Sequence, residues 1–195
     1  IATGASNDDD VNEIILNASK INKKLCIMQC NTNYTASDDN FKFINLNYLK
    51  SLKNKFPDLI LGLSDHTHGH ATVLGAIALG AKIIEKHFTL SNELVGPDHK
   101  FSMTPETWKD MVDKSRELEI SLGNGQKKIE ENEFKTVVLQ RRSIRVKNSL
   151  KKGHVLKRKD LVVLRPCPKD SLDPRNINKI LEKKINKDLP KHEII

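Results

Sequence analysis

The first 126 residues alternate short apolar runs with segments of helical periodicity. The runs at 25–28, 59–63 and 83–84 are too short for helices, and continuous apolar runs of this kind are typical of strands buried on both faces. We expect one further strand, which ends at Thr3. Strands that alternate with helices at this spacing predict βαβ units and a parallel sheet.

Four segments between these runs carry apolar residues at helical spacing. The last has the clearest limits, because Thr104 is a suitable N-cap, Pro105 suits the first helical position and Gly123 suits the end. The predicted helices cover residues 11–18, 41–52 (ended by Phe56-Pro57), 71–79 and 104–123. A closed barrel requires eight strand–helix units. These residues therefore form either a small open α/β domain or the second half of a barrel.

The remainder of the chain has a different pattern. Residues 124–136 are polar and predict a linker with room for helical turns, while 141–146 and 161–164 predict short strands. The segments 148–156 and 185–195 each combine a lysine-containing turn with an apolar pair, which indicates a small pseudo-symmetric β-rich module. Because such a module is too small for a large core, we expect it to dock on another surface.

Charge separates the same two parts of the chain. The formal net charge of +8 is concentrated after residue 126, where 20 Lys and Arg face 9 Asp and Glu. A basic segment of this kind is compatible with polyanion binding. Its single aromatic residue, Phe134, offers no stacking platform for bases. We therefore rank nucleic-acid binding last and expect no nucleic-acid partner.

Apolar run lengths and cysteines indicate the compartment. No apolar stretch approaches the ~20 residues of a membrane span, and no basic region precedes an apolar run at the N-terminus, so we expect no membrane segment or signal peptide. The three cysteines, Cys26, Cys30 and Cys167, are an odd and sparse set. They argue against a disulfide framework or a zinc site and favour a reducing cytoplasm.

Polar and titratable residues follow two of the predicted strands. Residues 62–70 and 85–89 come directly after apolar runs, which places them at the carboxyl ends of parallel strands, where α/β folds bind ligands. Neighbouring strand ends bring His66 and His87 to the same rim, where two imidazoles are a candidate metal pair. The alternative is that one or both histidines only cap strands. His70 is expected to open the next helix.

Weaker candidates lie on the same rim and in the basic module. Glu85 and Lys86 bring both charge signs to a strand end, where an ion pair is the simplest role. Asp98 follows a Gly-Pro turn and is either a turn residue or a hydrogen-bond partner for a polyol. Residues 30–35 offer amides and hydroxyls, and Thr3-Gly4 leaves backbone that a phosphate can approach. The residues suited to grip carboxylate or phosphate, or else to form solvated surface, are Arg141, Arg142, Arg145 and Arg165.

Together these stretches resemble the signature of the sialic acid synthases, the family of N-acetylneuraminate, legionaminate and pseudaminate synthases. The resemblance covers the whole chain and is carried by residues 62–67 (Gly-Leu-Ser-Asp-His-Thr), 80–90, 96–100, 141–144 and 164–166. It implies an α/β fold, the second half of a TIM (β/α)8 barrel followed by a small β-rich SAF domain (antifreeze-like, β-clip). The implied parts are a half-barrel at 1–123, a linker at 124–138 and the SAF domain at 139–195. Arg165 matches a SAF-domain arginine that reaches the partner's site in a domain-swapped homodimer.

The resemblance also implies an activity. It is the condensation of phosphoenolpyruvate with an N-acetylmannosamine-type sugar, an N-acetylated hexosamine, which gives a nine-carbon N-acetylneuraminate-like sugar acid and phosphate. In the family a divalent metal, usually Mn²⁺ with Mg²⁺ as the alternative, is bound by the histidines that match His66 and His87. These histidines and Asp98, which also matches a sugar contact, are the implied catalytic residues.

Further residues match substrate contacts of the family. Ser64 matches a contact to phosphoenolpyruvate, and Tyr34 matches a contact to the sugar. Thr32 stands where the family has a phosphoenolpyruvate-binding Asn or Ser. Thr32 or one of its neighbours, Asn31 and Asn33, is therefore expected to make that contact.

The chain departs from the family pattern in two places. Residues 2–5 are Ala-Thr-Gly-Ala where the family has Ser-Thr-Gly-Met, so a serine contact to phosphate is missing. The family's first four strands, with their phosphate-binding lysines and catalytic glutamates, have no counterpart in these 195 residues. We therefore expect a fragment that is inactive alone. The alternative is a non-catalytic sugar-binding or SAF module.

Overall fold

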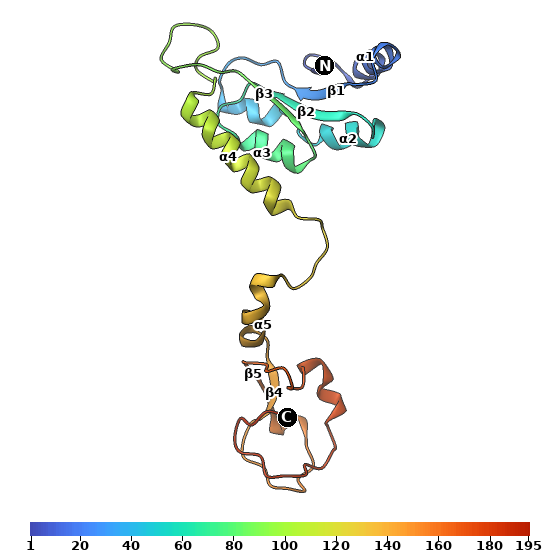
Figure 1. The fold of residues 1–195 in the computed structure, drawn as a ribbon, viewed down its shortest axis with the longest axis vertical. Helices are drawn as coiled ribbons and strands as arrows, with labels where there is room; N and C mark the ends of the chain where they lie inside the picture. The colour runs from blue at the N-terminus through green and yellow to red at the C-terminus, as the bar shows by residue number, and fades with distance from the viewer. The chain divides into compact units, whose positions relative to one another are not determined.

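A computed structural model describes residues 1–195, which form two compact units, Ile1–Gly125 and Gln126–Ile195. The chain passes from one to the other inside the segment 124–138 that the sequence predicts as a linker. Figure 1 shows the first unit in blue to yellow and the second in yellow to red. No helix of either unit has both the length and the apolar character needed to cross a membrane.

A three-stranded parallel sheet with the order β1-β2-β3 is the framework of the first unit. Its strands are Cys26–Cys30 (β1), Ile60–Asp65 (β2) and Ile83–Lys86 (β3), and each overlaps the apolar run that predicted it. The strand expected to end at Thr3 is reduced to one parallel bridge between Ala2 and Met28. The predicted parallel α/β architecture is confirmed.

Four α-helices belong to the same unit: α1 (Asp8–Ile21) precedes β1, α2 (Tyr48–Lys55) and α3 (Ala71–Ala78) connect the strands, and α4 (Pro105–Leu122) follows β3. Asn7 and Thr104 begin α1 and α4 with capping boxes, in which the cap side chain accepts from a first-turn N–H. The helix predicted over 41–52 is wrong in its first half, where a 3-10 helix, η1 (Asp38–Phe43), precedes α2. Between them Asn45 has a φ of 49°, a left-handed conformation that interrupts a continuous helix.

The two faces of the sheet differ because side chains alternate along each strand. Leu61 and Leu63 of β2 join the buried core formed with residues of the helices, among them Leu49, Leu52 and Val73. Figure 1 shows α2, α3 and α4 on one side of the sheet. Gly62 and Ser64 alternate to the opposite face. That face leads to the polar ends of the strands.

The second unit has a small core and two antiparallel strands, β4 (Ser143–Val146) and β5 (Leu161–Leu164). The segments 148–156 and 185–195, which share a sequence pattern, pair through an antiparallel bridge at Leu150–Leu189. Val155 forms a second bridge with Lys184, the residue before the second segment. The core residues are Val146, Leu156, Ile185 and Leu189. The predicted β-rich module is therefore closed by its own repeated segments.

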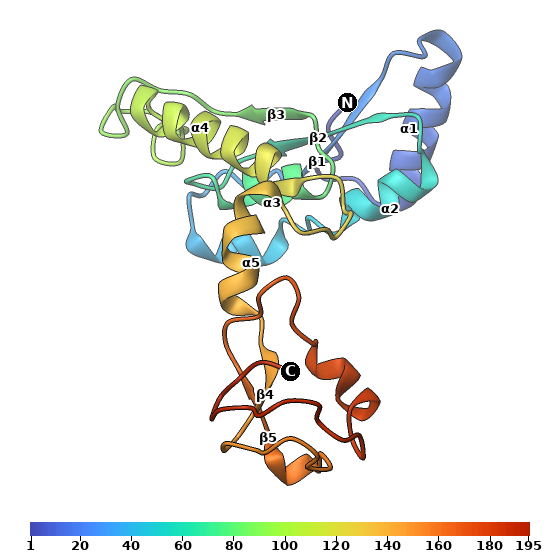
Figure 2. The same ribbon diagram turned by 60° about the horizontal axis from the view of Figure 1, so that its bottom comes forward.

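Helical structure extends into the second half of the predicted linker. A 3-10 turn, η2 (Glu131–Glu133), leads into α5 (Phe134–Gln140), and the turns η3 (Arg158–Asp160) and η4 (Pro174–Lys179) follow later in the chain. The backbone N–H of Cys167 donates to the carbonyl oxygen of Val138 at 2.9 Å. Because of this bond, α5 is attached to the second unit, which begins before residue 139. Figure 2 gives a second view of α5, β4 and β5.

Candidate functional site

The carboxyl ends of β2 and β3 bring two histidines together. His66 follows β2 and His87 follows β3, and the register that sets Asp65 opposite Lys86 makes the histidines neighbours. Their ring centroids are 5.1 Å apart, with an angle of 63° between the ring planes. The pair lies on one rim, as the strand pattern predicted. Its role as a metal site stays a prediction.

Hydrogen bonding determines which nitrogen of each ring is available to a ligand. His66 is buried, and its Nδ1 lies 2.8 Å from the carbonyl oxygen of Asn31. A carbonyl oxygen only accepts, so Nδ1 of His66 carries a hydrogen, and in the neutral ring the lone pair lies on Nε2. His87 turns its Nδ1 towards Asp98, with 3.5 Å between Nδ1 and Oδ2. Both rings therefore leave Nε2 for a ligand.

Two aromatic rings enclose the histidine pair. The Tyr34 centroid lies 4.2 Å from that of His66 and 5.7 Å from that of His87. The Phe101 centroid lies 5.0 Å from that of His87. Phe101 is 2% exposed and Tyr34 is 47% exposed, so Phe101 forms a buried wall and Tyr34 an accessible side. Sequence reasoning missed Phe101, because a single aromatic residue in a loop carries no periodic signal.

The histidine pair fits a divalent metal ion that keeps open coordination positions. Imidazole nitrogen is a common ligand for divalent transition metals, and a backbone carbonyl on the second ring nitrogen is a frequent outer contact of metal-binding histidines. No group of three or more His, Cys, Asp or Glu side chains is gathered for a metal anywhere in residues 1–195. A metal ion bound here would have His66 and His87 as its protein ligands, an arrangement that suits an open site and not a closed structural one.

The charged residues at these strand ends pair differently from the sequence expectation. Lys86 Nζ lies 2.6 Å from Oδ2 of Asp65, and both side chains are buried, so Lys86 does not pair with Glu85. Glu85 accepts a hydrogen bond of 2.7 Å from the Ser64 hydroxyl. Side chains alternate along the strands, so Asp65 and Lys86 both face the helices while Ser64 and Glu85 both face the other side of the sheet. Lys86 therefore meets Asp65 and not Glu85. The ion pair expected at this strand end is therefore made by Lys86 with Asp65, and Glu85 takes no part in it.

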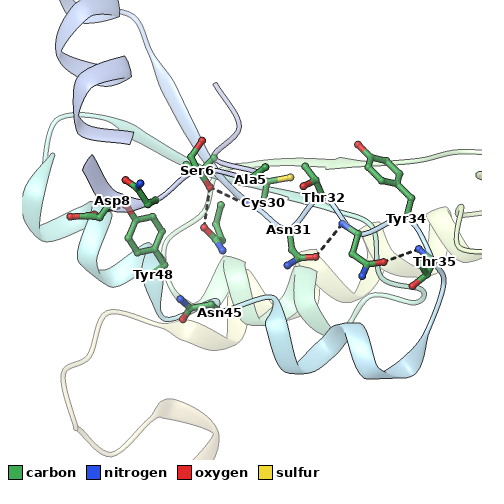
Figure 3. A pocket seen from close by; sticks show the side chains of 14 residues that line it. Ala5, Ser6, Asp8, Cys30, Asn31, Thr32, Tyr34, Thr35, Asn45 and Tyr48 are labelled. Atoms are coloured by element: carbon green, nitrogen blue, oxygen red, sulfur yellow. Dashed lines mark hydrogen bonds between the residues drawn. The ribbon is translucent and has the colours of Figure 1, made fainter. Parts of the chain in front are cut away.

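An open pocket of about 800 Å³ adjoins Tyr34 at the carboxyl end of β1 (Figure 3). It includes Asn31, Thr32 and Tyr34, which the sequence predicts as substrate contacts, and Asn45 and Tyr48, for which the sequence carried no signal. Asn side chains brace the loop, since Oδ1 of Asn31 and of Asn33 each accept from a backbone N–H two residues later. The full lining is Thr3, Ala5, Ser6, Asn7, Asp8, Gln29, Cys30, Asn31, Thr32, Asn33, Tyr34, Thr35, Asn45 and Tyr48.

The lining of this pocket is almost free of charge. Asp8 is its one charged residue, and hydrogen bonds from Lys55 and Tyr48 lower the pKa of its carboxyl. Burial, together with the hydrogen bond to Asp8, raises the pKa of Tyr48 to about 12. Burial also raises the pKa of the Cys30 thiol. Tyr48 and Cys30 are therefore neutral near pH 7, and the pocket suits hydroxyl and amide groups better than a phosphate.

Other candidates from the sequence have local partners. A Cβ on Gly4 would lie 2.2 Å from the methyl group of Thr32, so Thr32 closes the side of Gly4 that was expected to admit a phosphate. His70 occupies the N-cap position of α3, as expected, and its side chain makes no capping hydrogen bond there. Arg165 lies exposed in the second unit, where its Nε donates to the carbonyl oxygen of Gln140 at 2.8 Å. The role of Arg165 in a partner's site stays a prediction.

A parallel sheet whose histidine-bearing carboxyl end adjoins a polar pocket is the arrangement at which α/β domains typically bind ligands. Residues 1–127 match the model of the NeuB family. The chain belongs to this family. The resemblance to the sialic acid synthases that the motifs indicated is confirmed.

Relatives with known names support the same assignment. The chain is 38% identical over 165 residues to N,N'-diacetyllegionaminic acid synthase of Legionella pneumophila, covering 85% of this chain and 45% of the relative. It is 34% identical over 192 residues to pseudaminic acid synthase of Campylobacter jejuni, covering 97% and 53%. A crystal structure of N-acetylneuraminic acid synthetase from Leptospira borgpetersenii, in complex with citrate, superposes with a TM-score of 0.61 at 26% identity over 70% of this chain and 46% of that one. The chain thus spans about half the length of these relatives.

Proposed function

We propose that this chain is the metal- and sugar-binding half of a sialic acid synthase. The reaction joins phosphoenolpyruvate to an N-acetylated mannosamine-type sugar and releases phosphate. The first unit would be the second half of a (β/α)8 barrel, and the second unit would be the SAF domain. The observation that carries this proposal is the His66–His87 pair, whose Nε2 atoms remain available at the rim where this fold class binds ligands.

The reaction follows from the chemistry of the two substrates. The methylene carbon of phosphoenolpyruvate attacks the aldehyde carbon of the open-chain sugar and forms the new C–C bond. Water adds to the resulting oxocarbenium carbon, and phosphate leaves with cleavage of its C–O bond. A divalent cation, Mn²⁺ or Mg²⁺, held by His66 and His87 supplies polarisation and orientation of the sugar aldehyde when bound.

The remaining residues of the site would bind and orient the substrates. Tyr34 is accessible beside the histidine pair, and Asp98 has a half-exposed carboxylate beside His87, so both can hydrogen-bond sugar hydroxyls. Asn31 and Thr32 line the neutral pocket, where we assign contacts to the bound substrates. Ser64 retains its oxygen lone pairs after it donates to Glu85, and we assign it a contact to phosphoenolpyruvate.

We further propose that the whole enzyme works in the cytoplasm as a domain-swapped homodimer in which Arg165 serves the partner's site. Three observations support these proposals: all three cysteines are free, Arg165 is exposed, and the second unit has a core of only a few side chains. The candidate products are a neuraminate, a legionaminate and a pseudaminate, and a panel of the corresponding sugar substrates distinguishes them.

The test adds to this chain the N-terminal half of the barrel, taken from a relative. The 195-residue chain is mixed with Mn²⁺, phosphoenolpyruvate and each of three N-acetylated hexosamines, with and without a polypeptide covering the first half of the Legionella relative. Mass spectrometry detects the nine-carbon acid. We expect product only in the complemented mixture, and none when His87→Ala replaces the chain.

The matched control is the Legionella relative divided at the same position and recombined. If its two halves form product together and this chain forms none with any sugar, the synthase proposal is overturned. The non-catalytic sugar-binding module then becomes the better account.

A further inference from the structure

A buried ion-pair network lies beside the histidine pair, on the helix-covered side of the sheet. The Asp65 and Lys86 side chains are 0% and 1% exposed, and Nζ lies 2.6 Å from Oδ2. Asp65 also accepts from the Thr67 hydroxyl at 2.9 Å and from the Thr72 hydroxyl at 2.6 Å. The carboxylate is therefore held by hydroxyls as well as by the lysine, and its position is tightly determined.

The network joins the residues that flank both histidines. Asp65 precedes His66 and Thr67 follows it, while Lys86 directly precedes His87. Lys86 Nζ makes a second hydrogen bond, of 2.5 Å, to the carbonyl oxygen of Thr67. A single ammonium group from the end of β3 thus contacts the chain on both sides of His66.

Regular strand pairing does not extend this far. The β2–β3 register ends with Asp65 opposite Lys86, one residue before each histidine. Beyond it, the carbonyl oxygen of His87 accepts from Met103 and not from the His66 segment. Beyond the last paired residues, the Lys86 side chain therefore joins the end of β3 to the chain segment that contains His66.

Stability alone gives little reason for an ion pair at this place. Removing two charges from water costs free energy that their attraction often does not recover, and well-packed apolar side chains of similar size are frequently as stable or more stable. The core cluster on this side of the sheet is apolar and includes Leu63 and Val73, while the direct partners of the pair are the Thr67 and Thr72 hydroxyls and the Thr67 carbonyl oxygen. An ion pair whose net contribution to folding is expected to be small, and which is joined to both histidine segments, points to a positioning role.

We propose that Asp65 and Lys86 are positioning residues that set the separation and orientation of the His66 and His87 imidazoles. The proposal rests on the proposed function in one respect, the metal that these rings would hold. Outer contacts of metal ligands typically change metal affinity about 10- to 100-fold when they are removed. We expect loss of the network to weaken metal affinity by a factor in this range, because the backbone on either side of His66 would no longer be held in place.

The decisive variant is Asp65→Leu/Lys86→Met in the 195-residue chain, which replaces the ion pair by apolar side chains. Mn²⁺ affinity is measured by electron paramagnetic resonance during titration with MnCl₂ alone, and folding by urea denaturation. We expect a urea midpoint equal to or above that of the unchanged chain, with Mn²⁺ binding at least about tenfold weaker. An Mn²⁺ affinity within twofold of the unchanged chain, in a folded variant, would overturn the proposal.

Two further variants keep the test decisive. Lys109→Met/Asp113→Leu removes an exposed ion pair on α4, and we expect it to change neither measurement. Asp65→Asn keeps the shape of the side chain and removes the charge that pairs with Lys86. If the apolar double variant unfolds, weaker Mn²⁺ binding by folded Asp65→Asn supports the proposal, and binding within twofold of the unchanged chain overturns it.

A metal-free readout separates this proposal from the proposed function. If the unchanged chain binds no Mn²⁺, the metal assignment fails, and nuclear Overhauser contacts between the His66 and His87 rings then test positioning directly. The proposal requires these contacts in the unchanged chain and their loss in the apolar double variant. Contacts that persist in a folded double variant contradict it.

Discussion

Replacing Phe101 by alanine tests whether the loop that carries Asp98 is packed as firmly over the histidine pair as the geometry indicates. Phe101 is 2% exposed, and its ring lies 5.0 Å from that of His87 and 6.1 Å from that of His66. It is the most deeply buried of the four rings gathered here, since His66 is 6% exposed and the other two are more accessible. The substitution removes this wall and leaves the neighbouring hydrogen bonds of the loop in place.

The magnitude follows from the buried area of the ring. A buried aromatic side chain removes about 150–250 Å² from water, which at about 25 cal/mol per Å² corresponds to ~4–6 kcal/mol as an upper bound. Measured losses for Phe→Ala in protein cores are about 3–5 kcal/mol, because the cavity that remains relaxes only in part. We expect the free energy of unfolding of the first unit to fall by about 4 kcal/mol.

The assay is urea denaturation followed by the fluorescence of Trp108, the one tryptophan, which lies on α4 in the first unit. With a urea slope of about 1–3 kcal/mol per M, the midpoint should fall by roughly 2 M. Phe43→Ala is the matched control in the same unit, because Phe43 is 63% exposed, and it should cost under about 1 kcal/mol. A loss for Phe101→Ala no larger than that of the control would refute the packing argument.

Three other predictions address the sheet, the second unit and the thiols. A Cβ on Gly62 would lie 2.8 Å from the backbone oxygen of Ile83, so Gly62→Ala should lower the thermal midpoint measured by circular dichroism, at a cost of about 1–3 kcal/mol. The Arg175 side chain holds the pKa of Asp173 at about 2, so the stabilisation it provides is complete above pH ~4 and is lost as pH falls through 2. A carboxyl NMR titration should find this pKa and its rise in Arg175→Gln, and an unchanged value contradicts the assignment. Burial raises the pKa of Cys30, so iodoacetamide should alkylate it more slowly in the folded chain than in urea, as peptide mass spectrometry can follow.

The position of the histidine pair was predictable from the sequence because it depends on one rule. Parallel strands end at the same edge, so polar residues that directly follow two neighbouring apolar runs must lie close together. His66 and His87 satisfy this rule without any knowledge of side-chain packing. The same reasoning placed Tyr34 near the rim, since it follows β1 by only a few residues.

The contacts that support the pair were not predictable in this way. The partner of Lys86 depends on the exact strand register, and a shift of one residue would have exchanged Asp65 for Ser64. Phe101 is brought to His87 by a loop, for which the sequence pattern gives no direction. The break before α2 depends on the left-handed backbone of Asn45, a local choice that helical periodicity does not reveal.

The central claim is that His66 and His87 together hold one divalent cation. The most direct measurement is an Mn²⁺ titration, followed by electron paramagnetic resonance, of the unchanged chain, His66→Ala, His87→Ala and the control His68→Ala, whose exposed ring pairs with Asp38. We predict one bound Mn²⁺ per chain, lost in both His66→Ala and His87→Ala and retained in His68→Ala. Equal Mn²⁺ binding by the unchanged chain and by either of the first two variants would contradict the account.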